Sequence, residues 1–172
     1  MVQAAWGKPL IRPTMKNSDP STVNIDLQPG HAIRRLHQIS VGIFLQEAGD
    51  LGITPVQYAA LQVVGNQPGI DQRTLARTIA LDASTTGGVV DRLEARGWME
   101  RRTAPEDRRA RQLALTAAGE QALAACIPAM LRAQEQILAP LTERQRSDFM
   151  RLLNLLVTQN NEMSRAPSEA TR

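Results

Sequence analysis

The chain has 172 residues, of which 42% are apolar and only 3% aromatic, and its formal net charge is +3. This length fits one domain, or one small domain with an attached oligomerisation region, and the many Ala and Leu residues favour helices. No apolar run approaches the ~18 residues needed to cross a membrane, and the N-terminus lacks the apolar segment of a secretory signal. A lone cysteine, Cys126, excludes an intrachain disulfide and fits a reducing compartment. We therefore expect a soluble, mainly helical, cytoplasmic protein.

Positive charge is concentrated in one segment of the chain. The basic residues of this segment are Arg96, Arg101, Arg102, Arg108, Arg109 and Arg111, and its acidic residues are Glu100, Glu106 and Asp107. Such a patch favours contact with phosphate, because phosphate binding depends on local charge more than on the net total. Taken alone, the same run would also fit an ordinary solvated surface.

Residues 1–28 show no hydrophobic periodicity and contain Pro9, Pro13 and Pro20. Proline removes a backbone donor and interrupts helices, so we expect an extended arm here. Its apolar side chains either anchor the arm to a partner subunit or belong to a flexible tail.

Two helices are expected next, over residues 30–48 and from residue 55 to the Pro68-Gly69 stop. At ~100° per residue, one stripe of the first helix is wide enough to predict deep packing on at least one side. Its members are Ala32, Ile33, Leu36, Ile39, Ser40, Ile43 and Phe44. Thr54 is the expected N-cap of the second helix, with Pro55 in its first turn and Gln57 closing a capping box.

Two short helical patterns then follow back to back, with Asp71 and Asp82 as their expected N-caps. The inward-facing residues of the first are Leu75, Ala76, Ile79 and Ala80, and those of the second are Val89, Val90 and Leu93. This order predicts a helix-turn-helix, a motif whose second helix enters the major groove of DNA.

The N-terminal side of that second helix reads Ser84-Thr85-Thr86-Gly87-Gly88 and is expected to be exposed. Two adjacent glycines inside a helix cost on the order of 2 kcal/mol relative to alanine. Either another helix crosses closely at this point, or the backbone must approach DNA with no side chain in between.

A β-hairpin and two further helices complete the pattern. Residues 98–102 and 111–115 are expected to form strands around a turn at residues 103–110. Thr116 caps a long helix running to about Ala139, and Thr142 with Gln145 forms the capping box of the last helix. The apolar stripe of that last helix contains Phe149, Leu152, Leu153 and Leu156.

The predicted fold class is mainly α with a small β-hairpin wing, a winged helix-turn-helix whose terminal helices form a dimerisation region. The first and last helices carry more apolar surface than a small winged helix can cover, and a soluble monomer does not leave such faces in water. We expect an arm over 1–28, a helical dimerisation region over 29–52 and 116–161, a DNA-binding domain over 53–115 and a tail over 162–172.

Residues 82–119, DASTTGGVVDRLEARGWMERRTAPEDRRARQLALTAAG, resemble the MarR family of winged helix-turn-helix transcriptional regulators. The matching residues are Asp91-Arg92-Leu93-Glu94 with Gly97, Arg101-Arg102, Asp107-Arg108-Arg109, and Leu115-Thr116 with Gly119. The order and length of the flanking helices extend the resemblance to roughly residues 29–160. It implies a homodimeric DNA-binding regulator, usually a repressor, that a small ligand releases from DNA. The TTGGV stretch is similar to that of members which respond to aromatic carboxylates.

The recognition helix is expected to read DNA with its hydroxyl side chains. Ser84, Thr85 and Thr86 can contact base edges or phosphates, and Gly87 and Gly88 permit close approach of the backbone. Arg92, one turn further on, reaches phosphate or else pairs with a neighbouring Glu on the helix.

Further contacts are expected from the preceding helix and the wing. Gln72 and Arg73 would bind phosphates, which orient the protein without specifying sequence. Arg109 is the expected wing-tip residue in an A·T-rich minor groove, with Arg108 and Arg111 as alternates. Asp107 would be repelled by DNA and is assigned to an ion pair that shapes the wing.

The resemblance also implies a ligand site with walls from the first, second and fifth helices. His31, Arg34, Arg35 and His37 are cations or polar groups suited to a carboxylate, and Ser40 and Tyr58 can hydrogen bond to a ligand. Each of these residues has an ordinary structural role as its alternative.

Three alternative functions stay open. A redox-responsive repressor would sense oxidants through Cys126, although a buried structural thiol is the simpler interpretation. A helical dimer could act through protein partners without touching DNA. An enzyme finds little support, because the sequence has no GxGxxG, P-loop, HExxH or cysteine cluster, and we expect no cofactor or metal.

Overall fold

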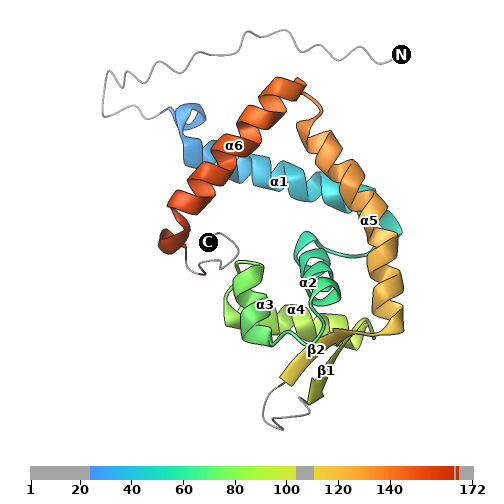
Figure 1. Cartoon of the computed structure of the whole chain (residues 1–172). Coiled ribbons are helices and arrows are strands. Elements are labelled where there is room, and N and C mark those ends of the chain that lie inside the picture. The colour runs from blue at the N-terminus through green and yellow to red at the C-terminus, as the bar shows by residue number, and fades with distance from the viewer. Residues whose placement is uncertain (1–23, 104–110, 165, 167–172) are drawn as a thin grey trace. The chain divides into compact units, whose positions relative to one another are not determined.

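The computed structural model describes residues 24–103, 111–164 and 166. The chain divides into two compact units, residues 1–39 and 40–172, and the boundary falls inside the first helix. Figure 1 shows the helices and strands of both units. The mainly helical fold with a two-stranded hairpin confirms the predicted fold class.

The first unit contains a short helical turn and the start of a long helix. The 3-10 helix η1, Ile25–Leu27, is capped by Asn24, whose side-chain oxygen accepts a hydrogen bond from the Asp26 backbone N–H at 3.0 Å. The expectation of an extended arm is therefore wrong for these last residues of the arm, because the Asn24 cap supports a turn. The arm's residues 1–23, with their three prolines, lie outside the described residues.

Helix α1, Pro29–Ala48, confirms the helix predicted over residues 30–48. Its stripe is not deeply packed along its whole length: Ile33 and Ile39 are 57% and 51% exposed, and burial is reached only at Phe44 and Ala48. The periodicity identified the apolar side of the helix but could not say which part of it the same chain covers. At its C-terminal end, Phe44 packs against Tyr58 with ring centroids 6.0 Å apart.

Helix α2, Pro55–Asn66, begins with the predicted capping box. The Gln57 backbone N–H donates to the Thr54 hydroxyl, and the Gln57 side chain accepts from the Thr54 backbone N–H. The 3-10 helix η2, Gly49–Leu51, connects α1 to α2.

Helices α3, Gln72–Thr78, and α4, Ala83–Ala95, form the helix-turn-helix. Leu75 and Ala76 of α3 are buried as predicted. Ala80 was predicted to face inward but is exposed, because it lies past the end of α3 with φ +53°, in the turn that leads to α4.

Strands β1, Met99–Thr103, and β2, Arg111–Leu115, pair antiparallel, with Met99 opposite Leu115 and Thr103 opposite Arg111. The first strand begins one residue later than predicted, because the backbone N–H of Trp98 still bonds to Leu93 O at the end of α4. The segment before α3 joins the hairpin through Gly69 N–H to Leu113 O and Leu113 N–H to Ile70 O, both 2.9 Å.

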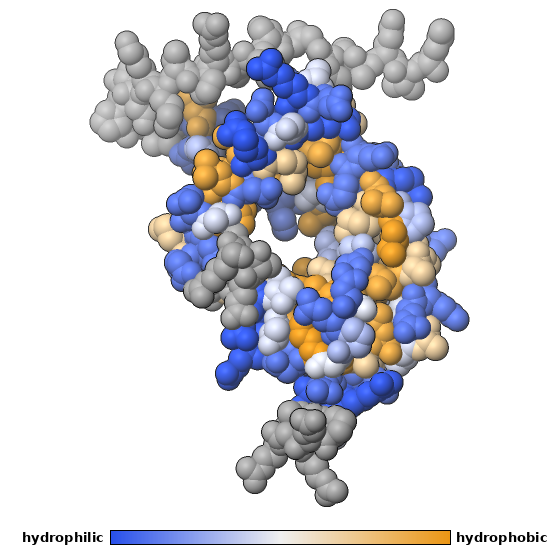
Figure 2. Space-filling view, in the orientation of Figure 1, coloured by the Kyte–Doolittle hydropathy of each residue, from blue (hydrophilic) through white to orange (hydrophobic). Residues whose placement is uncertain are grey.

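Two long helices follow, α5, Ala117–Leu138, and α6, Glu143–Gln159, and then the 3-10 helix η3, Asn161–Met163. Both predicted N-caps, Thr116 and Thr142, are present. Large apolar side chains remain at the surface along α5, among them Leu131 at 60% exposure (Figure 2). Within the described residues, no helix is both long enough and apolar enough to span a membrane.

The core of the second unit gathers buried side chains from α1, α2, α3, α4, β1, β2 and α5. Its largest fully buried members are Ile53, Leu61, Val64, Leu75, Val90, Leu93, Met99 and Leu113. Cys126, Ala129 and Ala133 close the core from α5 with small side chains. This core fixes α4 and the hairpin, which are the parts expected to meet DNA.

Gly119 marks the closest approach in this core. A Cβ at this position would lie 1.8 Å from the Trp98 carbonyl oxygen, so the first turn of α5 rests directly on backbone. Thr116 reinforces the contact by donating its hydroxyl to Gly97 O and its backbone N–H to Trp98 O.

We expect Gly119→Ala to lower the free energy of unfolding by about 3 kcal/mol, because backbone, unlike a flexible side chain, cannot move aside for a methyl group. Gly42→Ala is the matched control, since a Cβ there meets nothing within 4 Å. Replacing this helical glycine by alanine should raise the free energy of unfolding by about 1 kcal/mol. Urea unfolding of both variants gives the comparison, and equal stability would contradict the close contact.

Candidate nucleic-acid interface

The N-terminus of α3 is fixed by Asp71. Its carboxylate accepts hydrogen bonds from the backbone N–H groups of Arg73 and Thr74 at 2.9 and 3.0 Å, and from the Thr74 hydroxyl at 2.7 Å. The Thr74 side-chain hydrogen bond, and then that of its backbone, lowers the pKa of Asp71 below its usual range. The cap therefore stays ionised near neutral pH and holds the exposed Arg73 at the start of the helix.

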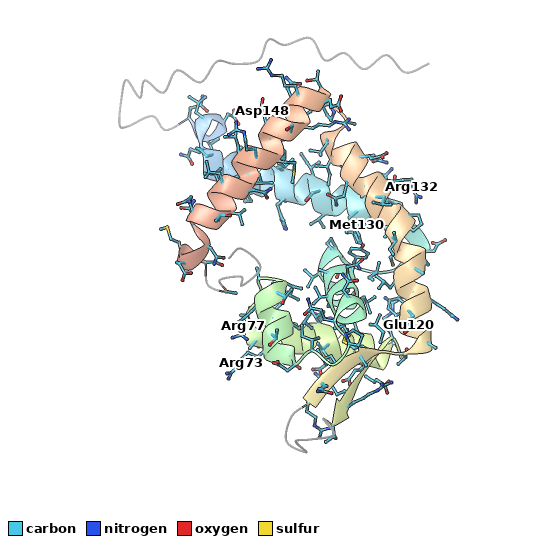
Figure 3. The ribbon with its side chains drawn as sticks, in the orientation of Figure 1. Arg73, Arg77, Glu120, Met130, Arg132 and Asp148 are labelled. Carbon is cyan, nitrogen blue, oxygen red and sulfur yellow. The ribbon has the colours of Figure 1, made fainter. Side chains whose placement is uncertain are left out.

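Arg73 and Arg77 lie one turn apart on α3, and both project away from the helix (Figure 3). Arg77 was not among the residues predicted to bind DNA, although its four-residue spacing from Arg73 places the two side chains on one face. The Arg77 guanidinium donates to the Thr74 hydroxyl at 3.4 Å.

The recognition helix α4 is capped in the same way. The Asp82 carboxylate accepts from the Thr85 backbone N–H at 2.8 Å and from the Thr85 hydroxyl at 2.6 Å. These bonds, led by the Thr85 hydroxyl, lower the pKa of Asp82. Ser84 and Thr85 are exposed at the start of the helix.

Thr86 was predicted to contact DNA, but its position in the structure does not allow this contact. It is fully buried, and its hydroxyl donates to Asp82 O at 2.9 Å. The reason is helical spacing, because Thr86 precedes Val89 and Val90 by three and four residues and so shares their inward face.

Gly87 and Gly88 are not required by packing inside the chain. A Cβ at Gly87 would meet the Gln72 amide nitrogen at 3.4 Å, and one at Gly88 would meet the Arg92 guanidinium at 3.6 Å. Both neighbours are the ends of flexible side chains, and neither glycine has a positive φ. Among the residues that the structure describes, no helix therefore crosses closely at these two glycines. The open backbone favours the second alternative, an approach by DNA.

Arg92 is exposed on α4, one turn after Gly88. The alternative role considered for it was an ion pair with a neighbouring glutamate. Across the part of the chain that the structure describes, no carboxylate lies within ion-pair distance of Arg92.

The wing is braced against α4 by Arg101, a role that the sequence did not reveal. Its guanidinium binds the carboxylates of Glu94 and Asp91, the latter at 2.7 Å, and donates to the Gln72 side-chain oxygen at 3.1 Å. The Arg101 backbone N–H also donates to Glu94 at 2.9 Å. The half-buried Gln72 thus helps to hold the wing, and its amide nitrogen lies beside Gly87.

The remaining predicted wing residues are only partly described. Arg111 is exposed at the start of β2, and Arg102 pairs with Glu100. Arg108, Arg109 and Asp107 lie outside the described residues.

The six residues predicted to bind a ligand are divided between the two units. His31, Arg34, Arg35 and His37 lie on the first part of α1, where the Arg34 guanidinium donates to Gln38 at 2.9 Å and lies 3.4 Å from His31 Nδ1. Ser40 and Tyr58 belong to the second unit. The Tyr58 hydroxyl donates to Gln62 at 2.9 Å, and burial, followed by the nearby Cys126, raises the pKa of Tyr58.

Cys126 is buried on α5, and burial raises the pKa of its thiol, against a smaller opposing effect of the Arg96 charge. Burial of the thiol and its raised pKa both oppose formation of the reactive thiolate. Within residues 24–103 and 111–164, no group of three or more His, Cys, Asp or Glu side chains is arranged to hold a metal ion.

Known proteins resemble this chain over most of its length. A sequence model of the MarR family matches residues 53–110. The transcriptional regulator HosA of Escherichia coli O111:H- is 33% identical over 127 residues, which are 74% of this chain and 93% of HosA. The crystal structure of the PcaV transcriptional regulator from Streptomyces coelicolor with its natural ligand has a TM-score of 0.74 at 32% identity, covering 79% of this chain and 96% of PcaV.

A second solved structure is that of Bordetella bronchiseptica BpsR, described as showing how 6-hydroxynicotinic acid regulates its DNA binding. It has a TM-score of 0.74 at 27% identity and covers 78% of this chain and 96% of BpsR.

We expect Gly87→Ala and Gly88→Ala each to stabilise the protein by about 1 kcal/mol, since alanine is the better helix former and has room at both positions. The same variants should bind DNA more weakly, because the new methyl groups stand where the backbone meets the duplex. Thermal unfolding and DNA titration of each variant provide the two measurements. Gly42→Ala is the control that should gain stability with unchanged DNA affinity, and full DNA affinity of both α4 variants would disprove the assignment.

The buried thiol of Cys126 should react with a thiol-specific dye far more slowly in the native protein at pH 7.5 than in denaturant. Its pKa lies above that of a free cysteine, about 8.5, so the reactive thiolate is scarce until the pH rises further. Cys126→Ala should bind DNA like the parent before and after peroxide treatment. If peroxide abolishes DNA binding in the parent but not in this variant, the result would support the redox alternative instead.

Proposed function

The chain belongs to the MarR family of transcriptional regulators, and from this premise we propose that it is a homodimeric repressor, released from a pseudo-palindromic operator by a small aromatic carboxylate. The observation that carries the DNA-binding part is the outer side of α4. Ser84 and Thr85 are exposed there, and two glycines leave the backbone open although no contact among the described residues requires glycine at these positions. A recognition helix contacts base edges with the residues of its N-terminal part, which is where these residues lie.

The cations around α4 supply the phosphate contacts of this proposal. Arg73 and Arg92 are exposed on α3 and α4, and Arg111 is exposed on β2. Contacts of this kind fix the register of the protein on the duplex. We add Arg77 to the residues proposed from the sequence, because it shares the outer face of α3 with Arg73. We keep Arg108 and Arg109 as proposed wing contacts.

The effector is proposed from the residues of α1 and from the relatives. His31, Arg34, Arg35 and His37 provide positive or polar groups for a carboxylate, and Ser40 and Tyr58 provide hydroxyl groups. PcaV was crystallised with its natural ligand, and 6-hydroxynicotinic acid, an aromatic carboxylic acid, regulates the DNA binding of BpsR. PcaV supports a small-molecule ligand for this chain, and BpsR supports an aromatic carboxylic acid as its chemical class.

Dimerisation is proposed from the apolar side chains that the single chain leaves in water. On α1 these are Ile33, Leu36 and Ile39, and on α6 they are Leu152, Leu155, Leu156 and Val157, all more than a third exposed. Residues 29–52 and 116–161 would then form the dimerisation region and residues 53–115 the DNA-binding domain. A symmetric dimer predicts half-sites about one helical turn apart.

The experiment that tests this function is a gel shift with the intergenic DNA upstream of the protein's own gene, repeated with benzoates, hydroxycinnamates and nicotinates. The proposal expects tight binding that one of these compounds releases. Binding that none of them releases would refute the effector class and leave DNA binding intact. Absence of binding at low salt would refute the DNA-binding role.

Arg109→Ala should weaken operator binding by about 1–3 kcal/mol and reduce its salt dependence, since one cation is withdrawn from the minor groove or phosphates. Titrations at two salt concentrations measure both effects. Arg144→Ala removes an exposed arginine of α6 and should leave both unchanged. Equal affinity of the Arg109 variant and the parent would refute the wing contact.

Leu156→Asp should convert the dimer into monomers, because it places a charge on the apolar face of α6 where Leu156 is 54% exposed in the single chain. Analytical ultracentrifugation over a range of protein concentrations measures the assembly. Asn154→Asp adds the same charge at another exposed position of α6 and should leave the dimer intact. A dimeric Leu156 variant would place the interface elsewhere.

A further inference from the structure

Arg96 binds the connection between α1 and α2 to the end of the recognition helix. Its guanidinium donates from Nη1 to Gly52 O at 2.7 Å and from Nη2 to Leu51 O at 2.9 Å. Arg96 is also the C-cap residue of α4, and its backbone N–H bonds to the carbonyls of Arg92 and Glu94. One residue thus closes the recognition helix and holds a segment 44 positions earlier in the chain.

The same guanidinium lies over the Trp98 ring, 3.5 Å from its centroid. Trp98 precedes β1, and its backbone is the surface against which Gly119 of α5 packs. Arginine suits this position because its planar group can stack on a ring while donating two hydrogen bonds in its plane. The contacts of Arg96 therefore join the α1–α2 connection, the end of α4 and the start of the wing.

The α1–α2 connection is shaped to receive this group. Gly49 and Gly52 adopt φ of +47° and +57°, a conformation that favours glycine, and the turn between them presents the successive carbonyls of Leu51 and Gly52 to Arg96. The next residue, Ile53, is buried in the core. The connection is thus anchored on one side by an apolar side chain and on the other by Arg96.

The C-terminal part of α1 is in turn fixed to α5. Glu47 accepts a hydrogen bond from Arg132 Nε at 2.7 Å and another from Gln136, and Arg132 is labelled on α5 in Figure 3. Phe44 and Ala48 are buried on the same segment. This segment continues directly into η2, and Leu51 and Gly52 at the end of that connection accept the hydrogen bonds of Arg96.

We propose that Arg96 is a positioning residue that couples the α1–α2 connection to the recognition helix, so that events at α1 and DNA binding at α4 influence each other. This inference rests on the proposed DNA-binding function. A ligand or a partner subunit bound away from DNA changes DNA affinity only through a conformational difference that both sites share. Coupling of this kind is reciprocal, so DNA bound at α4 must also alter the α1–α2 connection.

Hydrogen exchange of the full-length protein, with and without the intergenic DNA used above, tests the coupling. In the parent, DNA should slow exchange both in residues 84–96 and in residues 49–53. In Arg96→Gln the first segment should still be protected by DNA, while the second no longer responds. Arg144→Gln is the matched control, an exposed arginine on α6 that should behave as the parent.

Arg96→Lys separates charge from geometry, because lysine keeps the positive charge without the planar fork. Its exchange in residues 49–53 should resemble that of Arg96→Gln. A full response of these residues to DNA in either variant, or no response in the parent, would overturn the proposal. Wherever the first gel shift has found a releasing compound, Arg96→Gln should need a higher concentration of it for release.

Failure of the DNA-binding function is distinguishable from failure of the coupling. If the parent does not bind the DNA, exchange is compared in the free proteins. Arg96→Gln should then speed exchange in residues 49–53 and in residues 93–98 together, and acceleration confined to one segment would refute the coupling.

Discussion

The recognition helix must be held from one side only, because its other side has to remain available to DNA. Thr86, Val89, Val90 and Leu93 are the buried residues of α4, and they follow the spacing of a single helical face. The apolar core packs against this face, and polar contacts hold the two ends and the side that carries Asp91 and Glu94. Asp82 caps the start, and Arg96 closes the end. The core of the second unit therefore supports α4 through its buried face, while the exposed Ser84, Thr85 and Arg92 take no part in that core.

Apolar burial of Met99, Leu113 and Ala114 attaches the base of the hairpin to this support, and charge pairing attaches its outer part. Strand β1 has one buried side chain, Met99, at the end nearest the core. Further along, Arg101 brings two carboxylates of α4 and the amide of Gln72 to one guanidinium. Because α3, α4 and β1 all contribute to this group, a shift of the wing has to move both helices of the helix-turn-helix. The hairpin and the recognition helix should consequently behave as one body when they meet DNA.

Sequence patterns predicted the elements of this protein well wherever a local interaction decides the structure. The caps at Thr54, Asp71, Asp82, Thr116 and Thr142 are local, and all five are present. The prediction for Thr86 was wrong because it rested on the hydroxyl group alone, whereas the helical face of Thr86 decides its burial. The roles of Arg96 and Arg101 depend on partners up to 45 positions away, so no local pattern could reveal them. The stripe on α1 shows the same limit, since periodicity identifies an apolar face without identifying what covers it.

Charge pairing explains how a chain with a net charge of only +3 can present a basic surface. Asp91 and Glu94 lie on the recognition helix, where free carboxylates would repel phosphate, and both are bound by Arg101. Glu100 is paired with Arg102, while Asp71 and Asp82 are engaged as helix caps. Arg73, Arg92 and Arg111 remain exposed around α4, and in the proposed function they supply phosphate contacts. Since phosphate affinity depends on local charge, pairing of these acidic groups within the chain reduces the repulsion that they would otherwise exert on phosphate.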